Sequence, residues 1–333
     1  MSYETQFSSK KIIVANEMIP LTVLMPVKNG EQFIAKSITD ITTNIASFDE
    51  VIVIDDNSSD SSANLLRKWA KSDSRVRLLF NPSDGIVSAL NLGVQEASNH
   101  WIARFDVDDK YEADRLRFQR DKIDENVSAI FSDYDFWSAE RENLGLIPSA
   151  VTSTATSISL ISGQRTAHPS VLFNRERVME AGGYRAEDFP AEDLSLWLRL
   201  SRSGNLITVP RNLVHYRISR NSVTLQRQKE SLLKRKTLLS QIGINPNDAF
   251  RALESVSEIV NTYKSLNNYD ERTMLFFRDL YAVSKFHSYP NMQIRMLKST
   301  LSSGYSGLGF MPAILRLRKQ RMQRAHEREF NRS

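Results

Sequence analysis

The sequence of 333 residues contains no cysteine at all. It therefore forms no disulfide bonds and binds no metal through thiolates, as is usual for a cytoplasmic protein. Long hydrophobic runs are also missing, because no segment approaches the roughly eighteen uninterrupted apolar residues of a membrane-spanning helix. The first ten residues are polar and no sustained apolar segment follows them, which argues against a signal peptide. We expect a cytoplasmic protein that is either soluble or peripheral on the inner face of the cell membrane.

The chain does contain enough apolar residues for a substantial core, since 41% of it is hydrophobic, and its length favours two domains. The expected secondary structure changes after two strands, at residues 205–209 and 213–218, which a turn separates. Beyond them the pattern is helical nearly to the end. Earlier, the serine- and threonine-rich residues 151–157 are expected to form a mobile loop. We predict an α/β domain over residues 1–222 and a helical C-terminal region over residues 223–333.

A cluster of carboxylates follows the apolar segment 101–105. Asp106, Asp108 and Asp109 occupy three of four consecutive positions. Carboxylates this close repel one another unless positive charge lies among them. Oxygen ligands of this kind suit Mg²⁺ or Mn²⁺. The cluster therefore indicates a site for a divalent cation together with phosphate groups, although an acidic loop at the protein surface would look the same in isolation.

Two further apolar segments end in polar, turn-forming residues. The β-branched run 51–54 stops at Asp55 and Asp56, and the strand-like segment 21–25 runs into the turn-forming residues 26–30. A helical pattern follows each of them. Continuous β-branched runs are typical of buried parallel strands, and α/β sheets bind ligands beyond the carboxyl ends of such strands. We predict a βαβαβ unit with a Rossmann-like, mostly parallel central sheet, flanking helices and one rim that binds a ligand.

Five segments occur in an order that resembles a known family. They read LTVLMPVKNGEQFIAKSI, VIVIDDNSSDSSANLL, NPSDGIVSALNLGVQEA, WIARFDVDDKYEADRLRFQ and GGYRAEDFPAEDLSLWLRLSRSG. Together they resemble the family 2 glycosyltransferases of the GT-A fold, which transfer a sugar from a nucleotide-sugar donor with inversion. The resemblance covers residues 20–222 and says little about the rest of the chain.

The resemblance implies how the metal and the diphosphate are bound. Asp108 would bind Mn²⁺ or Mg²⁺, and Asp106 would contact the ribose or the same ion. Asp109 would support them. Arg104 would either pair with a carboxylate or reach the donor. The ion would neutralise charge on the departing diphosphate.

The resemblance also implies contacts to the nucleoside. Pro26 and Val27 would lie against the base, and Asp56 would accept a hydrogen bond from its ring N–H. Gly85 would border the ribose. Asp84 departs from the family pattern, in which glycine or asparagine is commoner.

The general base implied by the resemblance is Asp193, next to Glu192. Both residues begin an expected helix, where acidic residues are common because the helix dipole favours negative charge. By resemblance, a carboxylate here would accept the proton of the acceptor hydroxyl. His168 matches a position near the acceptor pocket, but a structural histidine would fit that position equally well.

A third protein ligand for the metal is not evident. Many relatives carry a histidine just after a Tyr-Arg-Ile-like run, where this chain has Ser219. His215 lies four residues earlier, about 13 Å away along a strand. We therefore do not expect His215 to be a simple substitute.

The C-terminal segment 311–333 is strongly basic, with seven basic residues against two glutamates. Its apolar residues recur at rough helical spacing. Such a helix could lie on anionic lipid, or it could be solvated or pack against the catalytic domain or a second subunit. The latter would allow a homo-oligomer through the C-terminal helices. Aromatic residues are not interleaved with the basic ones, so no nucleic-acid partner is expected.

The function implied is that of an inverting, metal-dependent hexosyltransferase. It would use a nucleotide sugar, in the first place a UDP-sugar, and a glycan or lipid-linked acceptor in surface polysaccharide biosynthesis. The alternative is a catalytically silent relative that scaffolds a glycan-synthesis complex. A nucleotidyltransferase would need a glycine-rich phosphate loop that residues 26–30 do not supply. A processive synthase would need membrane spans and a Gln-x-x-Arg-Trp-like sequence after the base, and the sequence has neither.

Overall fold

The computed structural model describes residues 19–242, with gaps at 48, 139–144, 163–165 and 220–225, together with Leu275 and Asp279. The basic segment 311–333 and most of the predicted C-terminal region lie outside the described residues. The division of the chain at residue 222 therefore stays a prediction.

The first part of the chain forms the predicted βαβαβ unit, and the fourth strand joins it. The elements are β1 (Leu21–Val27), α1 (Glu31–Asn44), β2 (Glu50–Asp55), α2 (Ser62–Ser72), β3 (Val76–Phe80), α3 (Ile86–Glu96) and β4 (Trp101–Arg104). The four strands are parallel and lie in the order β3-β2-β1-β4. The chain thus adds strands on one side of β1 and then returns to add β4 on the other side.

The second part extends the same sheet with antiparallel and parallel pairs. Its elements are β5 (Lys110–Tyr111), α4 (Arg115–Arg120), β6 (Val127–Trp137), β7 (Leu146–Ile147), α5 (Ser153–Ser162), β8 (Leu172–Asn174), α6 (Arg175–Glu180), α7 (Glu192–Leu200), β9 (Asn205–Arg217) and α9 (Gln228–Ile242), with short 3₁₀ turns at His168–Ser170 and Ala186–Asp188. The full order is β3-β2-β1-β4-β8-β6-β9-β5, and β7 pairs with β6. Because β8 is antiparallel to both β4 and β6, the sheet is mixed.

Two expectations for this part were wrong. Residues 205–209 and 213–218 were expected to be separate strands, yet residues Asn205–Arg217 form one strand, β9. Its pairing with β6 shifts between Ser132, opposite Val209, and Asp133, opposite Asn212, so Pro210 sits in an irregularity where it need not donate a hydrogen bond. The expected loop at 151–157 instead leads into α5, which buries Ile158 and Leu160.

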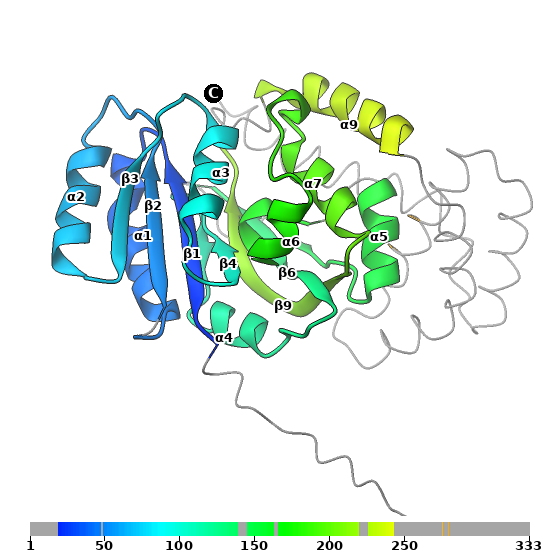
Figure 1. The fold of residues 1–333 in the computed structure, drawn as a ribbon, viewed down its shortest axis with the longest axis horizontal. Helices are drawn as coiled ribbons and strands as arrows, with labels where there is room; N and C mark the ends of the chain where they lie inside the picture. Colours follow the sequence, from blue (N-terminus) through cyan, green and yellow to red (C-terminus); the bar gives the residue numbers. More distant parts are fainter. Residues whose placement is uncertain are drawn as a thin grey trace, which may run out of the picture.

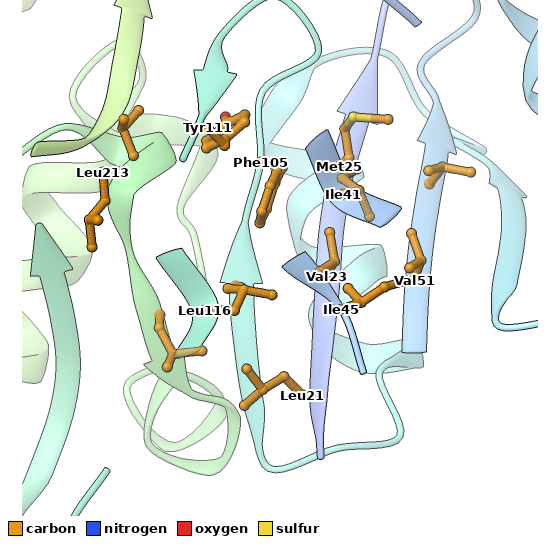
Figure 2. Close-up of a cluster of buried hydrophobic side chains, with 14 of the residues drawn as sticks. Leu21, Val23, Met25, Ile41, Ile45, Val51, Phe105, Tyr111, Leu116 and Leu213 are labelled. Carbon is orange, nitrogen blue, oxygen red and sulfur yellow. The ribbon is translucent and has the colours of Figure 1, made fainter. Parts of the chain in front are cut away.

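The core lies on both faces of the sheet, and alternation along the strands divides it. Leu21, Val23 and Met25 of β1 point to the face covered by α1, α2 and α4, whereas Leu24 points to the face covered by α3, α6 and α7. In Figure 1, α3 lies in front of the sheet and α1 behind it. Figure 2 shows the first of these clusters, in which Ile41 and Ile45 pack beside β1 and β2.

Helix α9 follows the boundary predicted at residue 222 and packs beside α7 (Figure 1). Leu238 is buried, and the Lys234 ammonium donates to the carbonyl of Glu187. The Arg227 guanidinium lies 5.0 Å from the centre of the Phe189 ring. Within the described ranges, no helix is both long and apolar enough to cross a membrane.

Candidate active site

The predicted donor and metal residues other than Gly85 lie at the carboxyl ends of β1, β2 and β4. These strands run parallel, so their ends meet at one edge of the sheet. The chain reverses its direction of growth across the sheet between β1 and β4, which is where open α/β sheets bind ligands. We call this edge the rim.

The loops after β1 and β2 are tied to each other. Asn29, with a positive φ of 52°, accepts a hydrogen bond on its side chain from the Ser59 backbone N–H at 2.8 Å. The Gly30 N–H donates to the Ser62 hydroxyl at 2.9 Å. The first turn of α1 is thereby fixed against the start of α2, which holds this part of the rim in one shape.

Asp56 lies at the centre of the predicted nucleoside side and is only 4% exposed. Its Oδ1 accepts from the Gly85 N–H at 3.0 Å and from the Asn81 amide. Its Oδ2 lies 3.8 Å from the Lys28 ammonium, which also pairs with Asp84. Asp84, which departs from the family pattern, is therefore an ion-pair partner of Lys28.

Gly85 ends the loop that precedes α3. Its φ of +105° is one that other residues rarely adopt, and a Cβ placed there would meet nothing within 4 Å. The backbone is therefore open to a ligand from this side. Pro26 and Val27 are buried by contrast, and the side chain of Val27, 1% exposed, packs in the core. These two residues therefore contribute to the rim through their backbone and not through their side chains.

The carboxylate cluster follows β4 as predicted. Asp106 pairs with the guanidinium of Arg104. Asp108 lies 3.5 Å from the guanidinium of Arg217, and Asp109 accepts the Arg217 backbone N–H at 2.7 Å. The cluster is thus held between the end of β4 and the end of β9.

The cluster carries more negative charge than its neighbours balance. Burial raises the pKa of Asp108, and the charge of Asp106 adds to the effect. Burial raises the pKa of Asp109 well above its usual value, with further contributions from Asp106 and Asp108. Oδ2 of Asp109 is also buried without a hydrogen-bond partner among the described residues. A cation placed here would relieve this excess.

The aspartates fit a hard divalent ion, since carboxylate oxygens are its preferred ligands. They do not form a complete protein cage: within the described part of the chain, no group of three or more acidic or histidine residues could hold a metal together. A metal at this rim would take its other ligands from phosphate or water, as Mg²⁺ commonly does.

Arg104 links the carboxylate cluster to a second acidic group. It is 4% exposed at the end of β4, and its Nε and Nη1 have no hydrogen-bond partner in the described structure. Its charge lowers the pKa of the nearby Glu192 and opposes the effect of burial there. Arg104 therefore pairs with Asp106, one of the two roles expected for it, and its charge also acts on the start of α7; its contact with the donor stays a prediction.

Glu192 and Asp193 form the first turn of α7. Burial, helped by the charge of Asp193, raises the pKa of Glu192 to about 7. The Asp193 carboxylate accepts the backbone N–H of Leu194 at 2.6 Å. Arg235 of α9 lies near enough for the charge of Asp193 to raise its pKa, against the larger lowering by burial. The described part of the C-terminal region thus reaches the acidic pair.

His168 lies in the 3₁₀ turn before β8 and contacts α7 through Trp197. Its Nε2 is 2.9 Å from the Tyr184 hydroxyl, and its ring packs edge-on against Trp197 with centres 5.7 Å apart. Burial lowers the pKa of His168 well below its usual value, and the charge of Arg104 lowers it further. The imidazole is therefore neutral at pH 7 and already has a hydrogen-bond partner.

His215 is engaged away from the aspartates that follow β4. Its Nδ1 lies 2.7 Å from Asp135 and its Nε2 lies 2.9 Å from Glu112, and the hydrogen bond with Asp135 is the main cause of its raised pKa. His215 therefore already has two carboxylate partners, and the expectation that it does not replace a third metal ligand stays a prediction.

Two residues of the site were missed from the sequence. Arg217 lies two positions after His215 on β9, so alternation places both side chains on the same face of the strand. Tyr184 carries the partner hydroxyl of His168. Neither contact has a local signal, because Asp108 and His168 are both distant in sequence from their partners Arg217 and Tyr184.

Comparisons with known proteins agree with the resemblance. A model of the family described as glycosyl transferase family 2 matches residues 22–172. The chain is 30% identical over 274 residues to an uncharacterized glycosyltransferase of Haemophilus influenzae, covering 75% of this chain and 83% of that protein. It is 25% identical over 228 residues to the UDP-Glc:α-D-GlcNAc-diphosphoundecaprenol β-1,3-glucosyltransferase of Escherichia coli, covering 65% of this chain and 83% of that one.

The fold is shared with solved structures. A mannosyltransferase from Pyrobaculum calidifontis, solved in complex with GDP-Man and Mn²⁺, matches with a TM-score of 0.56 and 16% sequence identity, covering 94% of this chain and 88% of that one. At this identity the likeness concerns the fold. The predicted GT-A architecture of a sheet flanked by helices is confirmed.

Proposed function

The chain belongs to glycosyl transferase family 2, and from that premise we propose that it transfers a sugar from a nucleotide sugar to a hydroxyl group of an acceptor, with inversion and with a divalent metal. The observation that carries the proposal is the rim itself. It carries the buried carboxylate of Asp56 and the cluster Asp106 to Asp109. The acidic pair at the start of α7 lies near enough for the charges of Arg104 and Asp106 to act on Glu192.

The donor we propose is a UDP-sugar. The E. coli relative is named for UDP-Glc and a diphosphoundecaprenol acceptor, which supports a lipid-linked or glycan acceptor and a role in surface polysaccharide biosynthesis. The mannosyltransferase that shares the fold was solved with GDP-Man, so a GDP-sugar is the second candidate. In either case Asp56 would accept the ring N–H of the base, and Gly85 would lie against the ribose.

The metal we propose is Mn²⁺ or Mg²⁺. When bound, such an ion neutralises negative charge on the diphosphate leaving group. Asp108 would hold it, and Asp106 would contact either the ion or the ribose. Asp109 is tied to the backbone of β9 and keeps the loop in place. The relative solved with Mn²⁺ and the raised pKa values of Asp108 and Asp109 support this assignment.

The general base we propose is Asp193. As the bond from the sugar C1 to the phosphate oxygen breaks, its electron pair stays on the diphosphate. The acceptor oxygen bonds to C1 from the opposite face, and its proton passes to the Asp193 carboxylate. Glu192, whose pKa of about 7 leaves it partly protonated near neutral pH, would stand beside the base and limit the local negative charge.

His168 is proposed to lie on the acceptor side, where it orients Tyr184 and the start of α7 rather than transferring a proton. We also propose that residues 1–222 are the catalytic domain and that residues 223–333 form a helical region. The basic segment 311–333 would bind an anionic membrane surface on the cytoplasmic side, and the C-terminal helices could also join subunits.

A second candidate function is a catalytically silent scaffold of a glycan-synthesis complex. A panel of UDP-, GDP- and dTDP-sugars with Mn²⁺, read by thermal shift, tests which donor binds. Release of nucleoside diphosphate in the presence of the selected donor then distinguishes the two functions, because a silent scaffold would release none. A protein that binds no nucleotide sugar at all would contradict the proposal.

The variant Asp108→Ala sharpens this experiment. We expect it to abolish the metal-dependent part of donor binding while the thermal transition of the free protein is retained. Asp114→Ala is the matched control, since Asp114 is also paired with an arginine, Arg117, but lies outside the carboxylate cluster. Unchanged calorimetric affinity of Asp108→Ala for the selected nucleotide with Mn²⁺ would remove Asp108 from the metal site.

A further inference from the structure

Arg217 ends β9 and is bound to the carboxylate cluster in two ways. Its backbone N–H donates to Asp109 Oδ1 at 2.7 Å, and its guanidinium Nη1 lies 3.5 Å from Asp108 Oδ2. The guanidinium also lies 4.6 Å from the centre of the Phe33 ring, in the first turn of α1. The backbone bond, the carboxylate and the ring together fix where this positive charge sits.

The guanidinium has hydrogen-bonding capacity that its neighbours do not use. An arginine carries five N–H donors. In the described structure, the side chain of Arg217 makes a single long contact with Asp108, and its Nε is buried without a partner. A contact at 3.5 Å is weak by geometric criteria. An ion pair optimised only for stability would be expected to use a shorter, two-pronged contact.

The other cations of the rim are already committed. Lys28 pairs with Asp84 and Asp56 on the nucleoside side. Arg104 pairs with Asp106 and is 4% exposed. The side chain of Arg217 is 18% exposed, and it stands directly beside the aspartate proposed to hold the metal. Arg104 also has unused donors but is almost fully buried, and Lys28 is bound on the nucleoside side. Of the three it is therefore Arg217 that combines unused donors, access to a ligand and a place beside that aspartate.

We propose that Arg217 binds the β-phosphate of the nucleoside diphosphate. The inference rests on the proposed function, since it assigns one more contact to the same donor. A guanidinium matches two phosphate oxygens with parallel hydrogen bonds, and its charge does not depend on pH in the working range. When the bond from C1 to the phosphate oxygen breaks, the electron pair left on that oxygen is stabilised by this fixed charge. Arg217 thus acts on the leaving group alongside the metal.

The test compares ligands that differ by one phosphate. Calorimetry with Mn²⁺ measures the Kd of UDP and of UMP for wild-type protein and for Arg217→Gln, with GDP and GMP as a second pair. Only the diphosphate carries the group that Arg217 would contact. We expect Arg217→Gln to raise the Kd of the diphosphate about tenfold or more and to change that of the monophosphate by less than about twofold. Arg217→Lys should raise the Kd of the diphosphate less than Arg217→Gln does. Lysine keeps the positive charge but cannot donate two parallel hydrogen bonds to the phosphate.

Arg77→Gln is the matched control. Arg77 is a partly exposed strand arginine that pairs with Glu50 and Glu96, but it belongs to β3 and lies away from the carboxylate cluster. It should leave both affinities unchanged. If Arg217→Gln does not fold, Arg217→Lys is tested alone. It should still weaken binding of the diphosphate more than binding of the monophosphate.

Three results would count against the proposal. If the Arg217 variants weaken the binding of UDP and UMP equally, or leave the Kd of UDP unchanged, Arg217 is only a structural partner of Asp108. If they tighten Mn²⁺ binding without weakening UDP, the arginine merely competes with the metal. A wild-type protein that binds neither UDP nor GDP would overturn the proposed function and this inference together, which separates that failure from the other two.

Discussion

Nε2 of His168 lies 2.9 Å from the hydroxyl oxygen of Tyr184, in a partly buried hydrogen bond beside α7. Tyr184 is buried and His168 is partly buried, so losing the hydroxyl leaves a ring nitrogen of limited solvent access without a partner. We expect Tyr184→Phe to lower the free energy of unfolding by about 1–3 kcal/mol, measured by urea denaturation. It should leave the affinity for the donor nucleotide near that of the wild type, since neither residue belongs to the proposed donor site.

A double-mutant cycle isolates this interaction. Combining Tyr184→Phe with His168→Phe should show a coupling energy of about 1 kcal/mol, because removing either partner already breaks the hydrogen bond. Strictly additive effects would mean that the two side chains stabilise the protein independently. His168 would then be free to contact the acceptor directly, and the role given to it here would be wrong.

The raised pKa of Glu192 predicts how stability depends on pH. The pKa is about 7 in the folded protein against 4.5 for an unperturbed glutamate, so between these values the folded state binds more protons than the unfolded state. The free energy of unfolding must therefore fall as the pH rises through this window, by roughly 3 kcal/mol at most. This stability is fully present below the unfolded pKa and is lost as the pH passes the folded one.

Glu192→Gln removes the titrating group and keeps its shape. We expect the variant to lose less stability than the wild type when the pH is raised from about 5 to about 8, measured by chemical denaturation without added metal. Glu187→Gln is a nearby control, since Glu187 lies in the turn that precedes α7. Parallel stability curves for Glu192→Gln and the wild type would show that Glu192 ionises normally.

The rim could be predicted because its signals are local. The run 51–54 ending at Asp55 and Asp56 already fixes a buried strand and the turn after it, and the same holds for the strand before Asp106. Parallel pairing then brings such ends together, whatever the details of packing. The positions of Asp56, Asp106 and Asp108 at one edge therefore follow from short stretches of sequence.

The second half of the sheet depends on contacts that are distant in sequence. Pro210 signals a break, but β9 passes through it because β6 offers an irregular partner there. The contact between Arg217 and Asp108 requires β9 to pair antiparallel with β5, where His215 lies opposite Lys110. Helix α5 was missed because serine and threonine favour turns, whereas burial of Ile158 and Leu160 decides the outcome.

The basic segment 311–333 lies outside the described residues, and its role is tested by deletion. We expect removal of residues 311–333 to weaken binding to liposomes that contain anionic lipid, without abolishing turnover of a soluble acceptor. The effect should shrink at high salt, because attraction between lysine or arginine and anionic headgroups is screened. Liposome sedimentation measures it. Unchanged or salt-insensitive binding would favour a helix that packs on the protein.

Asp193→Asn tests the proposed chemistry most directly. The amide keeps the shape of the side chain and loses the proton acceptor, so the defect should appear in the chemical step and not in donor binding. Removal of a general base costs about 10²–10⁴-fold in rate, whereas an acidic residue that only stabilises a helix start is worth about 1 kcal/mol. Turnover and donor Kd, measured on the same preparation, distinguish these roles. Glu192→Gln is the neighbouring control and should be milder. An Asp193→Asn enzyme that keeps more than about a tenth of wild-type turnover would place the base elsewhere, because general-base loss does not leave that much activity.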